Sequence, residues 1–284
     1  MPIGNVFTKL SSDYYQLTGA EKKVADYVTL HQHSTQFMSI SELAEEAGVA
    51  EATVSRFCRR LGYKGYNAFK LAVANSTAGQ KYANPLAGEV LPEDSIGDMC
   101  QKIYTADQGA LQQTLELIRP EAVQAAAELL LGAAKVLCMG QGGSMLLAQE
   151  AAHLFTTAMP NFHAIADSHL QAINIALMEE RDVVLYFSYS GSTREVVENL
   201  KLVRERRGKS ILITRFPKSP GAAYADVVLQ CGSREGPVQG GSVAARIAQL
   251  YLIDVLFSQV CRRDLESCRR RREQVAEVLS DKHI

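Results

Sequence analysis

The spacing of apolar residues divides the chain into two parts with different repeats. Up to about Ala78, apolar residues recur every three or four positions, which predicts short amphipathic helices and no strand. Beyond Asp98, short apolar runs alternate with helical patterns, which predicts βαβ units and a parallel sheet covered by helices. The stretch from Gly79 to Asp98 has little periodicity and repeated glycine and proline, which is typical of a linker.

We therefore expect an α + α/β protein: an all-helical domain over residues 1–78, a linker over 79–104, and a three-layer parallel-sheet domain over 105–284. The expected strands are 136–139, 162–165, 183–187, 210–213 and 227–230. The expected helices of the second domain are 105–118, 121–131, 144–157, 168–179, 193–207 and 241–260, with a last one from about residue 264.

The N-terminal part has the features of a helix-turn-helix. Thr18-Gly-Ala-Glu21 is a capping box, which starts one helix. A second helix begins at Ser39 or Ser41 and stops before Gly48, and a third covers residues 51–61. Two helices joined by a turn that contains glycine form the unit with which many proteins bind the DNA duplex.

The third helix carries the side chains that we expect to meet DNA. Thr53, Ser55 and Arg56 are expected to face outward near its start, where such a unit contacts base edges in the major groove. The following residues are expected to meet the phosphate backbone: Arg59, Arg60, Lys64 and Tyr66. Between Glu51 and Lys81, six basic residues accompany one acid, a local charge of +5. The alternative is an ordinary helical hairpin with a solvated basic face; the turn glycine and the helix pattern favour DNA binding.

Bulk composition indicates the class of protein but no partner. The 284 residues are 47% hydrophobic and 21% charged, as in a globular protein, and a net charge of −1 means that DNA binding needs a local patch. The apolar runs, such as 183–187, are far shorter than the roughly 20 residues that span a bilayer. The first ten residues lack the pattern of a secretion signal. The six cysteines show neither a C-x-x-C pair nor a zinc spacing, so we expect a reduced, cytoplasmic protein with no membrane partner, metal or cofactor.

Two loops of the second domain have the composition of an anion site. Gly140-Gln-Gly-Gly-Ser144 follows an expected strand and opens a helix, so backbone N–H groups can approach an anion there. Ser188-Tyr-Ser-Gly-Ser-Thr193 has the same position after another strand and is rich in hydroxyl groups. Because open α/β sheets bind ligands at the carboxyl ends of their strands, the two loops together predict a phosphate site.

Other phosphate motifs fit less well. Neither loop has the lysine of a P-loop, and a dinucleotide fingerprint that starts at Gly140 has Met145 in place of its third glycine. Asp167, after the second strand, could still act as the acid that binds a ribose, so a nucleotide remains an alternative ligand.

Further candidates for the same cleft are single side chains. His169 lies at an expected helix start, and Glu195 lies in the first turn after the serine-rich loop, where an acid also complements the helix dipole. Arg246 has apolar neighbours in the late helix, where a charge needs a partner such as a ligand anion. Glu235 precedes a Gly-Pro turn, and a loop role is as well supported there as a ligand role.

Taken together, these motifs resemble the RpiR-type bacterial transcriptional regulators, in which a helix-turn-helix domain precedes a sugar isomerase (SIS) domain. The N-terminal match comprises Ser41-Glu-Leu-Ala, Gly48-Val-Ala, Ala52-Thr-Val-Ser-Arg-Phe57, Leu61-Gly62, Gly65-Tyr66 and Phe69-Lys70. The C-terminal match comprises Gly140-x-Gly-x-Ser144, Ser188-x-Ser-Gly-x-Thr-x-Glu195, Thr214, Ala225-Asp226, Ser242, Arg246 and Asp254.

The resemblance implies a regulator of carbohydrate metabolism whose SIS domain senses a phosphosugar and assembles a homodimer or tetramer on palindromic, double-stranded operator DNA. It implies that the phosphate is held by Ser144, Ser188, Ser190 and Thr193. The sugar would then meet His169 and Arg246, with Glu195 as a further candidate. Gly143 departs from the pattern, because many members have serine or alanine there.

Two alternatives remain open at this point. The same fold supports phosphosugar isomerases and sugar-acid ether hydrolases, which need a positioned base near a sugar carbon. The basic helix-turn-helix favours regulation, since an enzyme has no need of it. The second alternative is a regulator whose SIS domain serves only for dimerisation.

Overall fold

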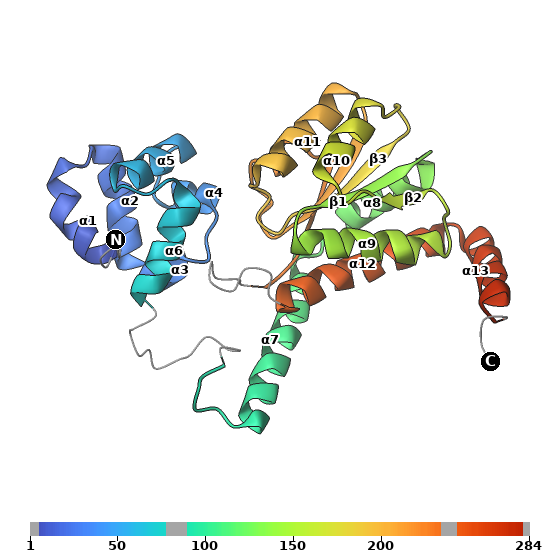
Figure 1. The fold of residues 1–284 in the computed structure, drawn as a ribbon, viewed down its shortest axis with the longest axis horizontal. Coiled ribbons are helices and arrows are strands. Elements are labelled where there is room, and N and C mark those ends of the chain that lie inside the picture. The colour runs from blue at the N-terminus through green and yellow to red at the C-terminus, as the bar shows by residue number, and fades with distance from the viewer. Residues whose placement is uncertain (1–5, 78–89, 234–242, 281–284) are drawn as a thin grey trace. The chain divides into compact units, whose positions relative to one another are not determined.

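A computed structural model describes residues 6–77, 90–233 and 243–280 (Figure 1). The chain divides into two compact units: one extends to Thr105, and the other contains Ala106–Ser233 and the chain from Val243. The expected linker falls partly on residues 78–89, which lie outside the described residues.

The first unit is helical, as predicted. Its elements are α1 (Val6–Asp13), a 3₁₀ turn (Tyr14–Gln16), α2 (Gly19–Leu30), α3 (Gln32–Thr35), α4 (Ile40–Glu46), α5 (Glu51–Arg60) and α6 (Tyr66–Thr77). The expected capping box of Thr18 with Glu21 is present on α2, and a second capping box, Ser39 with Glu42, fixes the start of α4 at Ser39. The core of the unit is aromatic at its centre, where the rings of Phe57 and Phe69 lie edge to face with centroids 5.5 Å apart.

The second unit contains a five-stranded parallel sheet in the order β2-β1-β3-β4-β5. Its strands are β1 (Val136–Gly140), β2 (Phe162–Ala164), β3 (Val183–Phe187), β4 (Lys209–Thr214) and β5 (Val227–Gln230). Its helices are α7 (Ile96–Leu117, which begins in the first unit), α8 (Pro120–Gly132), α9 (Gly143–Thr156), α10 (Ser168–Ala176), α11 (Arg194–Glu205), α12 (Val243–Arg263) and α13 (Leu265–Ser280), with a 3₁₀ turn at Ala222–Tyr224. The five predicted strands and the alternation of strands with helices are confirmed.

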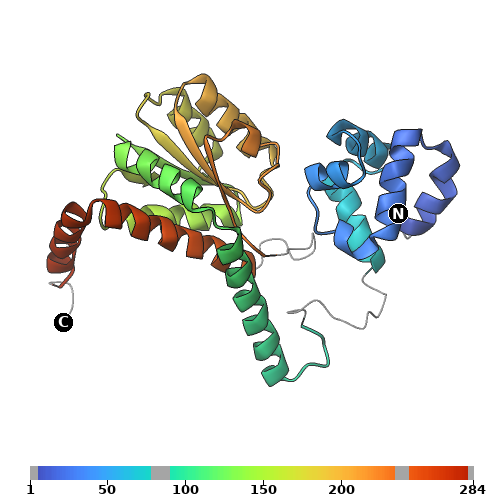
Figure 2. The ribbon, with the colours of Figure 1, turned by 180° about the vertical axis from the view of Figure 1, so that it is seen from behind.

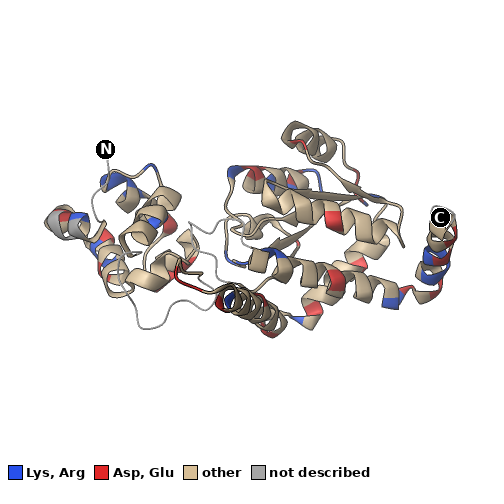
Figure 3. Cartoon of the chain, turned by 60° about the horizontal axis from the view of Figure 1, so that its bottom comes forward, with Lys and Arg blue, Asp and Glu red and all other residues tan. Residues whose placement is uncertain are grey.

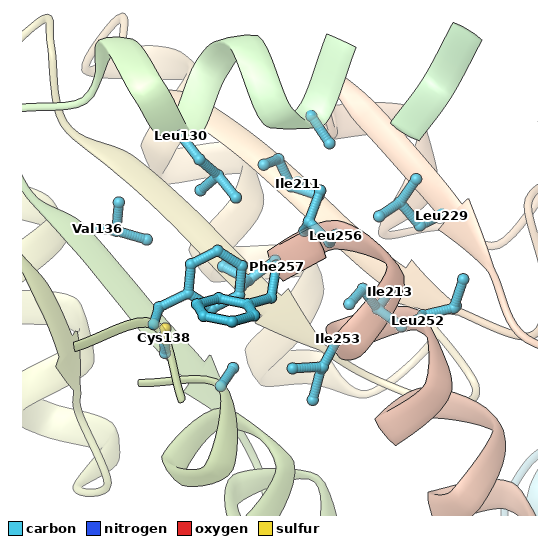
Figure 4. Close-up of a cluster of buried hydrophobic side chains, with 14 of the residues drawn as sticks. Leu130, Val136, Cys138, Ile211, Ile213, Leu229, Leu252, Ile253, Leu256 and Phe257 are labelled. Atoms are coloured by element: carbon cyan, nitrogen blue, oxygen red, sulfur yellow. The ribbon is translucent and has the colours of Figure 1, made fainter. Parts of the chain in front are cut away.

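Alternate side chains of β1, β3 and β4 enter two separate cores, so the sheet is the middle of three layers (Figures 1 and 2). On one face, Val136 and Cys138 pack with α8, α9 and α12. On the other face, Leu137 and Met139 pack with α10 and α11. Figure 4 shows the first of these cores, where Leu252 and Phe257 of α12 project among the strand side chains.

Helix α12 is, by length and composition, apolar enough to cross a membrane, with a mean hydropathy of 1.3. Its inner side chains, including Leu252, Leu256 and Val260, are buried in the core that it shares with α8 and α9. The apolar composition therefore has a physical reason within the fold. The expected start of this helix, at residue 241, lies outside the described residues.

The start of helix α7 differs from the prediction: the helix begins at Ile96 and not near Thr105. The Ser95 Oγ accepts a hydrogen bond from the Asp98 amide (3.1 Å), and the Asp98 carboxylate accepts one from the Ser95 hydroxyl (2.6 Å). This reciprocal cap satisfies N–H groups at the helix start, which explains a helix in a segment expected as linker.

Candidate functional site

Helices α4 and α5 form the predicted helix-turn-helix. The turn between them closes through backbone hydrogen bonds, from the Gly48 amide to the Glu45 carbonyl (3.0 Å) and from the Val49 amide to the Ala44 carbonyl (2.8 Å). The Ser41 hydroxyl donates a hydrogen bond to the Glu51 carboxylate, which ties α4 to the first residue of α5. The second helix is thus held at its start, where base contacts are made in units of this kind.

One outward orientation expected on α5 is wrong. Thr53 is only 7% exposed, because it lies one turn before Phe57 on the face that packs into the core. Its Oγ1 accepts a hydrogen bond from the Arg56 guanidinium (3.1 Å). Arg56 and Arg59 are exposed, and Ser55 is half-buried. Thr53 is thereby placed to orient Arg56, and the exposed side of α5 consists mainly of basic side chains.

Two of the residues predicted to contact phosphate have partners inside the unit. Arg60 pairs with Glu21 (Nε to Oε1, 3.2 Å) and donates to the Gln16 carbonyl (2.9 Å). The Tyr66 hydroxyl donates to the Met38 carbonyl (2.9 Å), and burial raises the pKa of this phenol well above 10. These contacts hold α2 and the entry to α4 against the helix-turn-helix. Lys64 is exposed in the loop before α6.

Acidic and basic residues are distributed over helices of both units (Figure 3). This matches the net charge of −1, so attraction for DNA requires a local basic patch such as the run on and after α5.

In the second unit, the two predicted anion loops lie side by side. Strands β1 and β3 are hydrogen-bonded neighbours, and Gly140 at the end of β1 pairs with Phe187 at the end of β3. The loop that starts at Gln141 and the loop that starts at Ser188 therefore leave the sheet at the same level. Because α9 and α11 cover opposite faces of the sheet, this is the point where the strand order reverses, the usual ligand position in open α/β sheets.

The loop Ser188–Thr193 folds back on itself through its own hydroxyl groups. The Ser188 Oγ accepts a hydrogen bond from the Gly191 amide (3.2 Å), and the Ser190 Oγ accepts one from the Ser192 amide (3.3 Å). Since a hydroxyl that accepts keeps its own O–H to donate, both serines can still donate to an anion. Gly191 has a φ of +58°, and a Cβ there would lie 2.0 Å from the Ser219 Oγ, so the turn requires glycine.

Helix starts contribute further donors. Thr193 is the residue before α11, and its side chain makes no capping hydrogen bond. The first backbone N–H groups of a helix have no partner within the helix and carry partial positive charge. Ser144 lies in the first turn of α9 and is half-buried. Loop hydroxyls and helix-start amides thus converge on one edge of the sheet, an arrangement suited to an oxyanion.

A buried polar cluster lies beneath the two loops. Gln171 of α10 is fully buried, and its amide nitrogen donates to the carbonyls of Gly140 (3.1 Å) and Ile165 (2.8 Å). Its amide oxygen accepts hydrogen bonds from Gln141 (2.9 Å) and Asn199 (3.2 Å). The cluster joins the first loop to α10 and α11, so the positions of these three elements depend on one another.

Comparison with known proteins places the whole chain. Residues 4–80 match the model of the helix-turn-helix domain of the rpiR family, and residues 129–259 match the SIS domain. An HTH-type transcriptional regulator of Caldanaerobacter subterraneus is 33% identical over 98% of this chain and 97% of its own length. The chain belongs to the rpiR family of HTH-type transcriptional regulators.

Solved structures agree with this family assignment. The Vibrio vulnificus NanR protein, solved in complex with ManNAc-6P, has a TM-score of 0.88 and 27% identity, and the match covers 98% of this chain and 99% of NanR. A protein of Bacteroides fragilis described as a phosphosugar isomerase involved in capsule formation matches 61% of this chain and 96% of its own, with a TM-score of 0.52 and 26% identity. The first likeness spans both units of this rpiR-family regulator, and the second is limited to part of the chain.

The predicted sugar contacts are spread over three helix starts of the regulator. His169 is exposed in α10, two residues before Gln171, which binds the backbone of the first loop. Glu195 is exposed in the first turn of α11. Arg246 lies half-buried in the first turn of α12. The candidates Glu235 and Ser242 lie outside the described residues.

Sequence reasoning missed the buried cluster of this regulator. Gln171 precedes the buried Ile175 by four positions, so it lies on the inner face of α10. A polar residue at a core position of an amphipathic helix was the available signal. Among the described residues, no three histidine, cysteine or acidic side chains are grouped as metal ligands, and all six cysteines are free thiols.

Proposed function

We propose that this rpiR-family regulator binds operator DNA through α4 and α5 and changes that binding when a phosphosugar occupies the two loops at Gly140–Ser144 and Ser188–Thr193. One observation carries the effector half of this proposal: the register of Gly140 with Phe187, which brings both loops to one edge of the sheet. The DNA half rests on the helix-turn-helix geometry and the family.

The chemistry of the two loops suits a phosphate dianion. Ser188 and Ser190 keep O–H donors, and Ser144 and Thr193 lie at helix starts beside amide groups. Hydrogen bonds to a charged group contribute roughly 1.5–3 kcal/mol each, so a few of them suffice for binding of a metabolite. No lysine or arginine is needed in this scheme, which accords with two loops that carry none.

The sugar end would extend toward His169, Glu195 and Arg246. A histidine, an acid and an arginine can each bind sugar hydroxyls or an acyl group. That NanR was solved with ManNAc-6P supports an effector of the phosphosugar class, and it makes this compound a sensible first probe.

Assembly and location follow from the same proposal. We propose a homo-oligomer joined through the SIS units, because a two-fold dimer reads two operator half-sites at a fixed spacing. An operator-binding protein acts in the bacterial cytoplasm, where free thiols such as those of the six cysteines are stable. The scheme involves no membrane partner.

An enzyme is the second candidate, because the Bacteroides fragilis protein described as a phosphosugar isomerase shares part of the fold. An isomerase needs a base that is positioned and activated beside the sugar. His169 and Glu195 are exposed, and nothing in their surroundings marks either as such a base. The complete helix-turn-helix unit favours a regulator without catalytic activity.

The test combines ligand and DNA binding on the full chain. Thermal denaturation is followed with ManNAc-6P, glucose 6-phosphate and glucosamine 6-phosphate, and with the unphosphorylated sugars as matched controls. A phosphosugar at 100 times its dissociation constant should stabilise the fold by about 2.7 kcal/mol, and the unphosphorylated sugar should not. Fluorescence anisotropy with DNA from upstream of the protein's own gene then measures operator affinity with and without the active compound.

Each outcome decides one part. Stabilisation with an altered operator affinity supports the proposal. Stabilisation by no phosphosugar would favour a domain that only assembles the oligomer, and turnover of a phosphosugar at ordinary enzyme rates would establish the isomerase.

A further inference from the structure

Helix α7 and the segment after β5 approach each other very closely. The Gly232 amide donates a hydrogen bond to the Thr114 Oγ1 (2.9 Å), and the Ser233 amide donates to the Gln113 Oε1 (3.3 Å). A Cβ at Gly232 would lie 2.6 Å from the Gln113 Cβ, so only glycine permits this approach. Thr114 is fully buried. The segment Cys231–Ser233 is therefore fixed to α7 at two consecutive amides.

The same segment is held from the effector side. The Tyr189 hydroxyl and the Arg215 guanidinium both donate to the Ser233 carbonyl, each at 3.1 Å. Ser233 has a φ of 94°, which a residue other than glycine adopts only when its surroundings enforce it. The four hydrogen bonds at Gly232 and Ser233 supply that enforcement, two from each side.

Tyr189 is also part of the effector loop. It lies between Ser188 and Ser190, two of the hydroxyl groups proposed to hold the phosphate. Its carbonyl accepts hydrogen bonds from the Thr214 hydroxyl (3.0 Å) and the Arg215 amide (3.0 Å), and its ring packs edge to face on Phe216. These contacts fix the backbone and the ring of Tyr189 and thereby the position of its phenol oxygen relative to the serine loop.

Helix α7 is the element that can carry a displacement toward the DNA-binding part. It is a continuous helix of 22 residues from Ile96 to Leu117, and among the described residues it is the next helix in the chain after α6. A helix transmits displacement along its axis because its backbone hydrogen bonds resist bending.

We propose that Tyr189 couples the effector loop to α7, through the Ser233 carbonyl and the contacts of Gly232 and Ser233 with Gln113 and Thr114. This coupling rests on the proposed function, since it is the route by which phosphosugar binding would alter operator affinity. Tyr189 is a positioning residue here, because its hydroxyl acts through Ser233 and is not assigned to the ligand.

The test removes one atom. Tyr189→Phe deletes the hydroxyl, while Arg215 still donates to the Ser233 carbonyl, so the fold is retained. Gln113→Leu breaks the link at its α7 end. Tyr251→Phe on α12 is the matched control, because the Tyr251 hydroxyl makes no hydrogen bond with the residues that the structure describes.

The measured quantity is the coupling factor, the ratio of operator dissociation constants with and without saturating ManNAc-6P or another phosphosugar that stabilises the wild type. Allosteric couplings are typically 5- to 150-fold. We expect Tyr189→Phe and Gln113→Leu to reduce this factor at least fivefold toward 1. The operator affinity without effector and the effector affinity without operator should each change less than threefold. Tyr251→Phe should keep the wild-type factor.

A second readout needs no effector. Hydrogen exchange of the Gly232 and Ser233 amides in the full chain should accelerate at least threefold in Tyr189→Phe and stay at the wild-type rate in Tyr251→Phe. A wild-type coupling factor in Tyr189→Phe, or unchanged exchange at these amides, would overturn the proposal. If the wild type binds no phosphosugar, the proposed function fails, and the exchange rates alone decide whether Tyr189 is linked to α7.

Discussion

The guanidinium of Arg56 donates a hydrogen bond to the hydroxyl of Thr53, one turn earlier on α5, at 3.1 Å. Thr53 is buried and Arg56 is exposed, so a core residue orients a surface arginine. A guanidinium has five N–H donors in a fixed plane, and this contact leaves the others to meet a base edge or a phosphate.

Arg56→Ala should therefore weaken operator binding. If Arg56 reads a base, the loss is roughly 1–3 kcal/mol and discrimination at one operator position is relaxed. If it meets only phosphate, binding weakens equally for all sequences and the salt dependence falls by about one charge. Anisotropy titrations at several salt concentrations separate the two cases. Arg206→Ala, exposed on the other unit, is the control, and an unchanged affinity for Arg56→Ala would place recognition elsewhere.

Arg60→Ala should act mainly on stability. Its partner Glu21 is buried, and although burial by itself raises the pKa of that carboxyl, hydrogen bonds from Thr18 and the charge of Arg60 lower it overall. Because Arg60 is about half exposed, we expect a loss of no more than about 1 kcal/mol at pH 7.

The pH dependence of stability checks this role of Arg60. A carboxyl with a lowered pKa stabilises the fold fully above its unfolded value of about 4.3, and this stabilisation is lost as the pH falls through the folded value. Urea denaturation at pH 7 and pH 3 should show a smaller difference for Arg60→Ala than for the wild type. Arg59→Ala, exposed on the same turn, should leave the difference unchanged, and equal behaviour of both variants would contradict this role.

Ser190→Ala should separate ligand binding from DNA binding. A lost hydrogen bond to a charged phosphate is worth roughly 1.5–3 kcal/mol, so the dissociation constant of the effector should rise roughly 10- to 150-fold. Operator affinity without effector should stay at the wild-type value. Calorimetric titration with the active phosphosugar and anisotropy with the operator give the two numbers. The control is Ser258→Ala on the exposed side of α12, and an equal loss of both affinities would refute the division of roles.

The thiols offer a check on burial in α5. Burial raises the pKa of Cys58 to about 12, and thiolate is the reactive form, so Cys58 should resist labelling in the folded protein. Exposed Cys100 should react readily at pH 8. A reagent such as DTNB with the wild type and with Cys100→Ser measures this difference. Because the folded pKa of Cys58 is raised, its contribution to stability is complete below about pH 8.5 and is lost as the pH rises through the folded value.

Local signals in the sequence were sufficient for most of the fold. The Thr18 capping box and the five apolar strands can be recognised from runs of neighbouring residues, and all are found. The early start of α7 was missed because its cap, Ser95 with Asp98, lies in a segment of weak periodicity. The positions of the two loops proposed to bind phosphate were predictable, because both directly follow buried strands.

Contacts between distant segments were not predictable in the same way. The burial of Thr53 follows from its spacing to Phe57, but its polar hydroxyl group made it a candidate for a DNA contact, and its inward orientation was missed. The pairing of Arg60 with Glu21 and the hydrogen bond of Tyr189 to Ser233 join residues 39 and 44 positions apart. No pattern in a single sequence specifies such pairs, because they depend on how packed elements meet.

Gln171→Leu should destabilise the sheet unit and weaken effector binding together. The substitution keeps the volume but removes every hydrogen bond of the side chain, leaving the Gly140 and Ile165 carbonyls and the Gln141 and Asn199 amides without this partner. Each unsatisfied buried group costs about 1–3 kcal/mol, so a loss of several kcal/mol is expected if the cluster does not rearrange.

Asn174→Leu is the matched control for Gln171→Leu, because Asn174 lies on the same helix and bonds only to the carbonyl of Leu170 within that helix. Urea denaturation measures the stability of both variants, and calorimetry at a temperature where both are folded measures their affinity for the active phosphosugar. Since Gln171 fixes the backbone of Gly140, at which the first loop begins, its loss should weaken ligand binding beyond any effect of Asn174→Leu. Wild-type effector affinity in a destabilised Gln171→Leu would show that the cluster supports the fold alone and that the first loop holds its shape without it.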